Sequence, residues 1–338
     1  MEDRKLMQIS VIIPVYNAAK YVRQAVESAL SQPEVAEIIL IDDASSDNSF
    51  NICQELANES PIVKLFCHSD QKNHGASASR NVGIQKANCD YIAFLDADDF
   101  YLPGRFKLAG EQLTKYPEID GVYEAVGTYF EDEDSKNIWT SIGRGDNKLT
   151  TINETINPEL LFETLLLNKE AGWFHANGLL VRKTIFNLTG YFDENLEFSE
   201  DIVMWFKMAA VGKLLPGSLE IPVAMRRVHS HNHVTRFHEK LVYYSNLPRW
   251  ETLFIWGYKN GLESRKLALL FSQYADSLTN QSLGEKTDFI HKKFYNLHKF
   301  VVMMLLIIKY PKLIKLARYF YSFTESNLIK KSMKLLWN

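Results

Sequence analysis

The chain has 338 residues, of which 46% are hydrophobic, so it can bury a substantial core and is not a disordered protein. Its formal net charge is −3, but residues 291–338 contain ten Lys or Arg and one acid; this segment carries +9 and the first 290 residues carry −12. An acidic body argues against a nucleic-acid-binding protein with a broad basic face. The charged residues 1–5 lack the apolar segment of a secretory signal, and three cysteines without a CxxC pair suit a reducing cytosol.

Residues 8–100 alternate between short apolar runs and amphipathic segments. We predict strands at residues 10–13, 37–41, 62–66 and 91–95, and helices after Asn17, from about Asp47, and over residues 76–86. Asn17 is suited to cap the first of these helices. The repeated order of strand, helix and strand indicates right-handed crossovers, and therefore a mostly parallel sheet of the α/β class.

The pattern loosens after residue 102. Helical stretches are predicted between residues 103 and 170, interrupted by a strand at 121–130 and a polar loop at 131–137. A further strand region, a turn and a helix are expected at residues 172–182, at 190–194 and after Asp201. Beyond residue 236 the sequence predicts mainly helix, without further strand alternation.

Three carboxylates, those of Asp96, Asp98 and Asp99, follow the apolar strand at residues 91–95. Like charges this close raise one another's pKa unless a cation lies among them. Divalent cations such as Mg²⁺ favour carboxylate oxygen, but a solvated acidic turn would need no metal. The residues alone leave both interpretations open.

Polar residues follow three of the predicted strands. Residues 14–17 (PVYN) follow the first strand, residues 42–47 (DDASSD) the second, and the acidic turn the fourth. Because parallel strands end at one edge of a sheet, these residues should form a ligand site there. PVYN has no glycine, which excludes a GxGxxG dinucleotide site, and neither a P-loop nor an EF-hand fits the sequence.

Four ordered segments resemble glycosyltransferase family 2, whose members have the GT-A fold. They are SVIIPVYN at residues 10–17, IDDASSDNS at 41–49, GASASRNVGIQKANCDYIAFLDADD at 75–99, and GYFDE with SEDIVMWFKMA within 190–209. The resemblance covers about residues 8–236. It implies a GT-A catalytic domain over residues 1–236, with a donor-binding half at about 8–100 and an acceptor and base half at about 101–236. A helical C-terminal region would follow over residues 237–338.

The resemblance also implies which residues bind the donor. Pro14 and Tyr16 would lie beside the nucleotide base, and Asp43, rather than Asp42, would accept a hydrogen bond from uracil. Asp96 and Asp98 match the DxD motif, with Asp96 toward the ribose and sugar, and Asp98 toward a Mn²⁺ or Mg²⁺ ion that bridges the diphosphate. Arg80 would lie near the sugar diphosphate, with a helix-surface ion pair as the alternative. The predicted donor-binding residues are Pro14, Tyr16, Asn17, Asp42, Asp43, Arg80, Asp96 and Asp98.

Glu200 and Asp201 form a second acidic pair, at the start of a predicted helix. An N-cap role would explain one acid there. By the resemblance, Asp201 is the general base that takes the proton from the acceptor hydroxyl, and Glu200 lies beside it. The family often has Arg where Lys207 stands, so an acceptor contact at that position does not carry over.

His229, in MRRVHSHNHVT at residues 225–235, matches the histidine of the segment that closes over the donor in this family, and Arg227 matches its arginine. The resemblance therefore gives Asp98, Asp96 and His229 as metal ligands. His231 and His233 alternate with His229, so that a strand would place all three on one face as a zinc site. A flexible polar loop is the favoured interpretation of that stretch.

These implications predict a metal-dependent, inverting glycosyltransferase of the hexosyltransferase type. The donor would be a UDP-sugar and the acceptor a hydroxyl of a glycan or of a lipid-linked molecule; no nucleic acid partner is expected. One alternative is a non-catalytic module that binds nucleotide-sugar or carbohydrate on the same scaffold. Another is a sugar-phosphate nucleotidyltransferase, which would need a glycine-rich, lysine-bearing phosphate loop that the sequence lacks after the first strand.

The C-terminal segment combines apolar and basic residues. The apolar run at residues 300–308 is too short to span a bilayer. After Pro311, the side chains of Lys312, Lys315 and Arg318 would share one side of a helix, as in basic amphipathic helices on anionic membranes. A helix packed on the catalytic domain is the alternative. We expect a cytoplasmic protein, with peripheral attachment to the inner face of the membrane as the hypothesis to test.

Residues 291–338 should attach the protein to anionic vesicles through the +9 charge of this segment. Truncation at about Glu285 should give a protein that no longer sediments with such vesicles at low salt. A full-length protein that stays in the supernatant under the same conditions would favour the packed-helix alternative.

Overall fold

The computed structural model describes residues 7–141, 149–168, 170–230, 232, 246–283 and 310. The chain divides into two compact units, Met1–His238 and Glu239–Asn338. In the second unit, helices α10 (Asn246–Lys259) and α11 (Ser264–Leu283) pack together through aromatic contacts of Phe254. The described part of this unit is therefore helical, as the sequence predicts, whereas most of the basic C-terminal segment lies outside the described residues.

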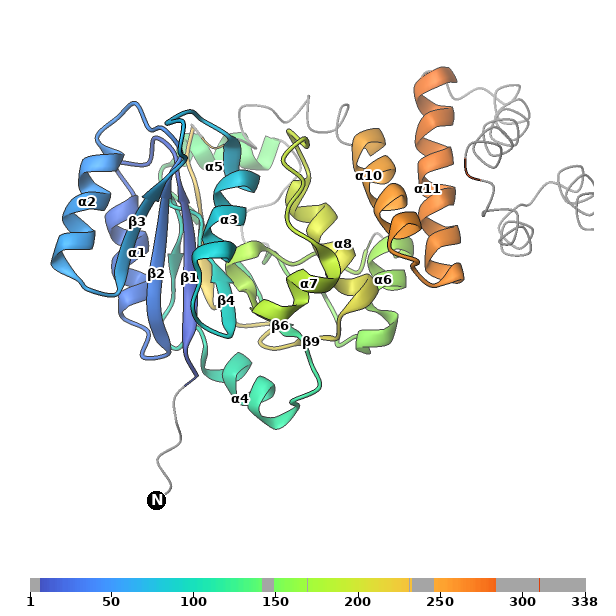
Figure 1. Ribbon diagram of the computed structural model, residues 1–338, viewed down its shortest axis with the longest axis horizontal. Coiled ribbons are helices and arrows are strands. Elements are labelled where there is room, and N and C mark those ends of the chain that lie inside the picture. Colours follow the sequence, from blue (N-terminus) through green and yellow to red (C-terminus); the bar gives the residue numbers. More distant parts are fainter. Residues whose placement is uncertain are drawn as a thin grey trace, which may run out of the picture. The chain divides into compact units, whose positions relative to one another are not determined.

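The first unit contains a seven-stranded sheet with the strand order β3-β2-β1-β4-β8-β6-β9 (Figure 1). Strands β1, β2, β3 and β4 are mutually parallel, β8 runs antiparallel to β4 and β6, and β9 is parallel to β6. In chain order the strands are β1 (Ile9–Val15), β2 (Val35–Asp42), β3 (Val63–Cys67), β4 (Tyr91–Phe94), β6 (Gly121–Tyr123), β8 (Leu179–Arg182) and β9 (Leu214–Pro216). This is the mostly parallel α/β architecture that the sequence predicts.

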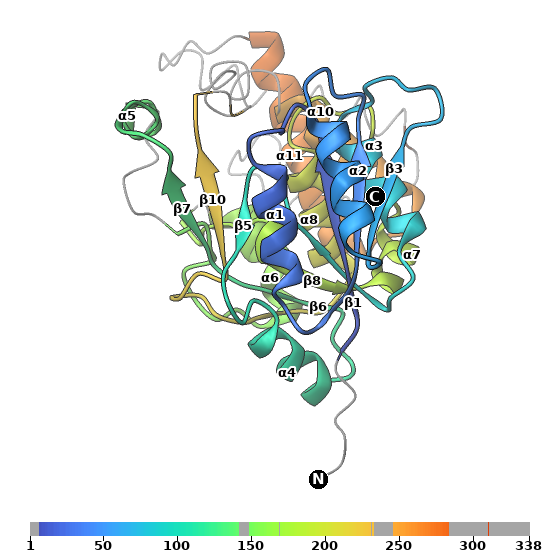
Figure 2. The same ribbon diagram turned by 90° about the vertical axis from the view of Figure 1, so that its left-hand side faces the viewer.

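A smaller sheet of three strands lies beside the first, in the order β5-β10-β7 (Figure 2). Its strands are β5 (Phe100–Tyr101), β7 (Val126–Phe130) and β10 (Ala224–Val228). Strand β5 follows the acidic turn and pairs with β10 through Met225 and Ala224. The small sheet therefore brings residues near position 227 next to the acidic turn.

Helices cover both faces of the large sheet because side chains alternate across each strand. On β1, Val11, Ile13 and Val15 pack in one core with α1 (Val22–Leu30) and α2 (Ser49–Glu59). Ile12 points to the other face, toward α3 (Gly75–Lys86). Among the described residues of this unit, the remaining α-helices are α4 (Lys107–Lys115), α5 (Glu133–Ser141), α6 (Pro158–Leu167), α7 (Phe186–Thr189) and α8 (Glu200–Val211). Two short 3₁₀ helices, η1 (Ala176–Gly178) and η2 (Lys183–Ile185), flank β8.

The structure corrects several expectations from the sequence. Asn17 does not cap α1, which begins five residues later; Asn17 has a φ of 50° and its Oδ1 accepts N–H bonds from Ser46 and Asp47. Residues 131–137 are not a loop throughout, because α5 begins at Glu133 with two acids in its first turn, where the helix dipole favours them. The expected strand at 121–130 is two strands in different sheets, and that at 172–182 is limited to Leu179–Arg182.

Two helical glycines offer a matched test of this packing. A Cβ at Gly83 on α3 would overlap the side chain of Ile12, whereas a Cβ at Gly110 on α4 would meet only Met7 Sδ, at 4.0 Å. We expect Gly83→Ala to lower the free energy of unfolding by about 1–3 kcal/mol through overpacking. Gly110→Ala should raise it by about 0.5–1 kcal/mol through helix propensity. Urea unfolding of both variants measures the difference, and a stabilising Gly83→Ala would contradict the close approach of α3 to β1.

Candidate active site

The three polar segments predicted from the sequence meet at one edge of the large sheet (Figure 1). In the parallel registers, Val15 pairs with Asp42, and Ile12 pairs with Phe94. The chain therefore leaves β1, β2 and β4 at neighbouring points. This is the edge where parallel sheets bind ligands.

The loops that follow β1 and β2 are tied to each other. The Asn17 N–H donates to Ser45 Oγ at 3.1 Å, and the Asn17 side chain accepts the Ser46 N–H at 2.7 Å. Pro14 is part of β1, while Tyr16 is 54% exposed. Asn17 thus has a structural role that the sequence did not reveal, and the Tyr16 ring is accessible at the edge.

Asp43 holds the start of α3. Its two carboxylate oxygens accept the N–H groups of His74 and Gly75, each at 2.7 Å, and His68 Nε2 lies 3.3 Å from one of them. Asp43 Oδ2 accepts one of these N–H groups and can accept a further hydrogen bond. Asp42 accepts the Ser45 N–H with one oxygen, while its buried Oδ1 has no hydrogen-bond partner among the described residues.

The acidic turn orients its three carboxylates differently. The Asp99 N–H donates to the Asp96 carbonyl at 3.0 Å, and the Asp99 side chain is buried. Its two oxygens accept the Arg227 N–H at 2.7 Å and the Asn177 amide at 2.6 Å. Burial, followed by the charges of Asp98 and Asp96, raises the pKa of Asp99 well above its usual range. Asp96 and Asp98 keep 28% side-chain exposure and are the two members that a ligand can reach.

Arg80 connects this turn with the start of α8. Its guanidinium lies 2.9 Å from Asp96 Oδ1 and 3.3 Å from Glu200 Oε1, and only 7% of the side chain is exposed. Burial favours a raised pKa for Asp96, but Arg80, followed by His175, outweighs burial and lowers it. Arg80 is therefore part of a buried network between two acidic sites, not a surface ion pair along its own helix.

Glu200 and Asp201 are the first two residues of α8. The preceding Ser199 has a φ of 64°, in the left-handed region, and its side chain does not cap the helix. Burial, followed by the charge of Asp201, raises the pKa of Glu200 to about 7, although Arg80 opposes this shift. Asp201 is half-buried, and its Oδ1 accepts the Ile202 N–H at 2.7 Å. The two acids lie where the positive end of the helix dipole stabilises carboxylates.

His229 follows β10 and reaches the acidic turn. Its Nε2 is 3.1 Å from Asp98 Oδ2, which also accepts a hydrogen bond from the Asn232 side chain at 2.9 Å. The guanidinium of Arg227 donates to the Asp98 carbonyl at 2.9 Å and lies over the rings of Tyr21 and Tyr129. His231 and His233, the other members of the conceivable zinc site, lie outside the described residues.

Among the described residues, the structure brings together a different group of possible metal ligands from the predicted one. The predicted ligands Asp96, Asp98 and His229 come from the acidic turn and from the end of β10. A second group, Asp96, Asp99 and His175, has ligand atoms within 4.8 Å of one another. His175, which the sequence analysis missed, lies in the poorly patterned stretch before β8. Carboxylate oxygen and imidazole nitrogen both suit Mn²⁺, so the donor set fits the predicted metal.

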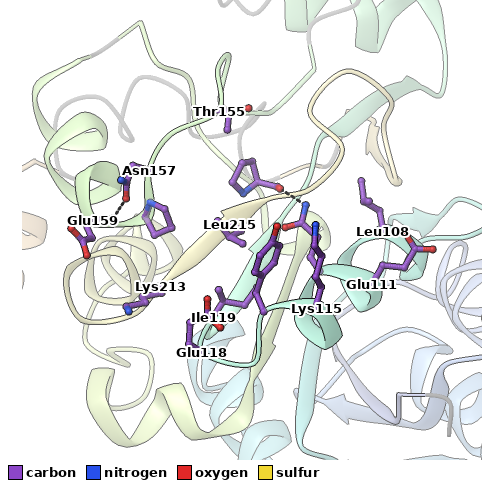
Figure 3. A pocket seen from close by; sticks show the side chains of 14 residues that line it. Leu108, Glu111, Lys115, Glu118, Ile119, Thr155, Asn157, Glu159, Lys213 and Leu215 are labelled. Carbon is purple, nitrogen blue, oxygen red and sulfur yellow. Dashed lines mark hydrogen bonds between the residues drawn. The ribbon is translucent and has the colours of Figure 1, made fainter. Parts of the chain in front are cut away.

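The pocket in Figure 3 is separate from these residues. It has a volume of about 620 Å³ and is lined by Leu108 and Lys115 of α4, Lys213 and Leu215 near β9, and residues before and at the start of α6. None of the predicted site residues lines it. The predicted site residues therefore lie outside this hollow.

Comparison with known proteins agrees with this geometry. Residues 10–166 match the model of the family described as glycosyl transferase family 2. An uncharacterized glycosyltransferase of Rickettsia typhi is 28% identical over 207 residues, which cover 61% of this chain and 60% of the relative. The minor teichoic acid biosynthesis protein GgaA of Bacillus subtilis is 30% identical over 212 residues, covering 58% of this chain and 42% of that protein. The match thus spans about three fifths or less of the length of these relatives.

Solved structures show the same fold. The crystal structure of residues 1–349 of S. aureus TarS in complex with UDP-GlcNAc aligns with a TM-score of 0.58 and 18% identity, covering 93% of this chain and 84% of that one. The same TarS fragment in complex with UDP aligns with a TM-score of 0.54. The mostly parallel sheet and the smaller second sheet thus form the GT-A fold, which the TarS fragment shares. Residues 10–166 are thus similar to glycosyl transferase family 2, in agreement with the resemblance of the sequence motifs.

The raised pKa of Glu200 predicts a pH-dependent stability. The folded protein holds this proton up to a pH of about 7, whereas an unfolded Glu loses it near its ordinary value of 4.5, so that ionised Glu200 destabilises the fold as pH rises. Glu200→Gln should therefore be more stable than the wild type at pH 8.5. The stability gap between the two proteins should grow by about 2 kcal/mol between pH 5.5 and pH 8.5. A gap that is constant over this range, measured by denaturant unfolding, would show that Glu200 titrates normally.

Proposed function

We propose that this protein transfers a sugar from a UDP-sugar to a hydroxyl group of a glycan or lipid-linked acceptor, with inversion at the anomeric carbon. The observation that carries the proposal is the contact of Arg80 with both Asp96 and Glu200. Through it, the DxD motif at the end of β4 and the predicted base on α8 become neighbours. A donor diphosphate and an acceptor hydroxyl can then approach each other across a short gap.

We choose a UDP-sugar as the donor because of the residues proposed to bind the nucleotide base, Tyr16 and Asp43. The accessible ring of Tyr16 offers a stacking surface, and Asp43 retains acceptor capacity for the N3–H of uracil. The TarS fragment, which has the same fold, was crystallised with UDP and with UDP-GlcNAc. UDP-GlcNAc is therefore the first donor to assay.

A Mn²⁺ or Mg²⁺ ion would be held by Asp98, with Asp96 and His229 as further ligands. When bound, such an ion supplies positive charge that offsets the charge accumulating on a diphosphate leaving group. Among the residues of this chain, Arg80 is placed to act on the same charge, because its guanidinium lies beside Asp96. Its contribution is larger in the transition state than in the ground state, which is the condition for accelerating the reaction.

The transfer is a single displacement. The acceptor oxygen forms a bond to the anomeric carbon as the bond from that carbon to the diphosphate oxygen breaks, and the electron pair leaves with UDP. The proton of the acceptor hydroxyl passes to the carboxylate of Asp201. Glu200 accepts a hydrogen bond from Arg80, so Asp201 is the member of the pair proposed as base.

For the acceptor we propose a chemical class and not a particular molecule. A relative named for minor teichoic acid biosynthesis supports a polymeric glycan or a lipid-linked precursor. No helix in the described ranges is long and apolar enough to cross a membrane. Peripheral attachment through residues 291–338, and the domain boundary near residue 236, remain part of this proposal.

Two variants should fail in different ways if the roles are correct. Asp201→Asn should leave UDP affinity nearly unchanged, because a base acts only on the acceptor proton, while sugar transfer falls about 10²–10⁴-fold. Asp98→Asn should weaken Mn²⁺-dependent UDP binding as well as transfer. Calorimetry with UDP, together with a transfer assay on a panel of UDP-sugars and acceptors, measures both quantities.

Transfer by Asp201→Asn within a few-fold of the wild-type rate would assign the base elsewhere, with Glu200 as the next candidate. A wild-type protein that binds UDP-sugar without transfer or hydrolysis would favour the binding-module alternative. Formation of a nucleotide-sugar from a sugar phosphate would favour the nucleotidyltransferase alternative.

A further inference from the structure

A fully buried asparagine, Asn177, lies behind the acidic turn. It belongs to η1, 78 residues after Asp99 in the chain, and none of its surface is exposed. The side-chain Oδ1 accepts the Asp96 N–H at 3.1 Å, and Nδ2 donates to Asp99 Oδ2 at 2.6 Å. One carboxamide therefore joins the first and last residues of the turn.

The orientation of this carboxamide is determined by its partners. The Asp96 N–H can only donate, so the amide oxygen must face it, and the NH₂ group must then face Asp99. An ionised aspartate could accept the Asp96 N–H but could not donate to Asp99, and a hydrocarbon of the same size could make neither bond. The asparagine at position 177 therefore presents an acceptor to the Asp96 N–H and a donor to the Asp99 carboxylate, as the turn requires.

The backbone of Asn177 is itself held by a buried ion pair. The backbone carbonyl of Asn177 accepts a hydrogen bond from Arg105 Nε at 2.9 Å, and Arg105 Nη1 pairs with Glu124 Oε2 at 2.7 Å. The side chains of Arg105 and Glu124 are both 0% exposed. Gly178 allows η1 to lie against the backbone of Glu124, which a Cβ at this position would overlap. The support is therefore a buried, charge-assisted network and not a single contact.

We propose that Asn177 is a positioning residue for the donor site. By holding the Asp99 carboxylate inward and the Asp96 backbone in place, it leaves Asp96 and Asp98 directed toward the ligand. This inference rests on the proposed function, since it assigns Asn177 to the same metal and nucleotide site. Residues that orient metal ligands without touching the metal affect metal affinity by about 10–100-fold.

The test compares Asn177→Asp with the matched variant Asn88→Asp. Asn88 Nδ2 donates to Glu37 Oε2 at 3.0 Å, so both substitutions replace an amide by a carboxylate facing another carboxylate. Glu37 belongs to β2 and Asn88 precedes β4, away from the ends of these strands that carry the acidic turn. Each full-length variant is titrated with UDP in calorimetry at increasing Mn²⁺ and with EDTA, and amide hydrogen exchange is followed at residues 94–99.

We expect Asn177→Asp to raise the Mn²⁺ concentration for half-maximal UDP binding about 10–100-fold. Exchange of the Asp96 amide should accelerate at least about tenfold, because the new carboxylate repels Asp99 and loosens the turn, although one of its oxygens can still accept the Asp96 N–H. Asn88→Asp should change neither quantity, even if its melting temperature falls by as much as that of Asn177→Asp. Should Asn177→Asp fail to fold, Asn177→Ala removes both hydrogen bonds without adding charge, and the same two quantities are measured on it.

Wild-type Mn²⁺ dependence together with wild-type exchange in the Asn177 variant would overturn the inference. If the wild-type protein binds no UDP with or without Mn²⁺, the proposed function fails instead. Hydrogen exchange then decides the role of Asn177 alone: faster exchange of the Asp96 amide supports it, and unchanged exchange refutes it.

Discussion

The site depends on a buried positive charge held between carboxylates that come from distant parts of the chain. Asp96 at the end of β4 and Glu200 at the start of α8 would repel each other without the guanidinium of Arg80 between them. Arg80 belongs to α3, which packs on β1 and β2, so its position is set by the core of the sheet. The acidic turn and the start of α8 are therefore held together by one cation whose own place is fixed by packing.

Asp99, at the other end of the acidic turn, is also a buried carboxyl group, but its oxygens are satisfied in a different way. Asp99 is deeply buried and receives no direct ion pair from a side chain among the described residues; a backbone N–H and an amide satisfy its oxygens. The nearby Arg105 charge is balanced by Glu124. Hydrogen bonds from neutral donors thus hold the carboxyl group in place without a positive charge beside it, and burial keeps its pKa raised.

The sequence predicts strands β1 to β4 and the edge at which they end, because the signals for these strands are local. Apolar runs identify β1 to β4, and parallel pairing then places their following residues at one edge. What it misses depends on contacts between distant segments. The roles of Asn177 and His175 require β8 to pair antiparallel with β4, a strand reversal without a local signal. Asn17 looked like a helix cap because an asparagine before a helix fits that pattern, but the β2–α2 loop binds its side chain instead.

Ser199 shows a further consequence of how the acid pair is placed. A non-glycine residue in the left-handed region costs about 1–2 kcal/mol, and here it is the residue immediately before Glu200 and Asp201. Glycine at this position would relieve the strain but would also widen the range of directions in which the chain enters α8. The residue that sets the direction of entry into α8, and so the approach of Glu200 to Arg80, therefore carries a conformational cost. Substitution at position 199 would change how α8 begins without altering either carboxylate.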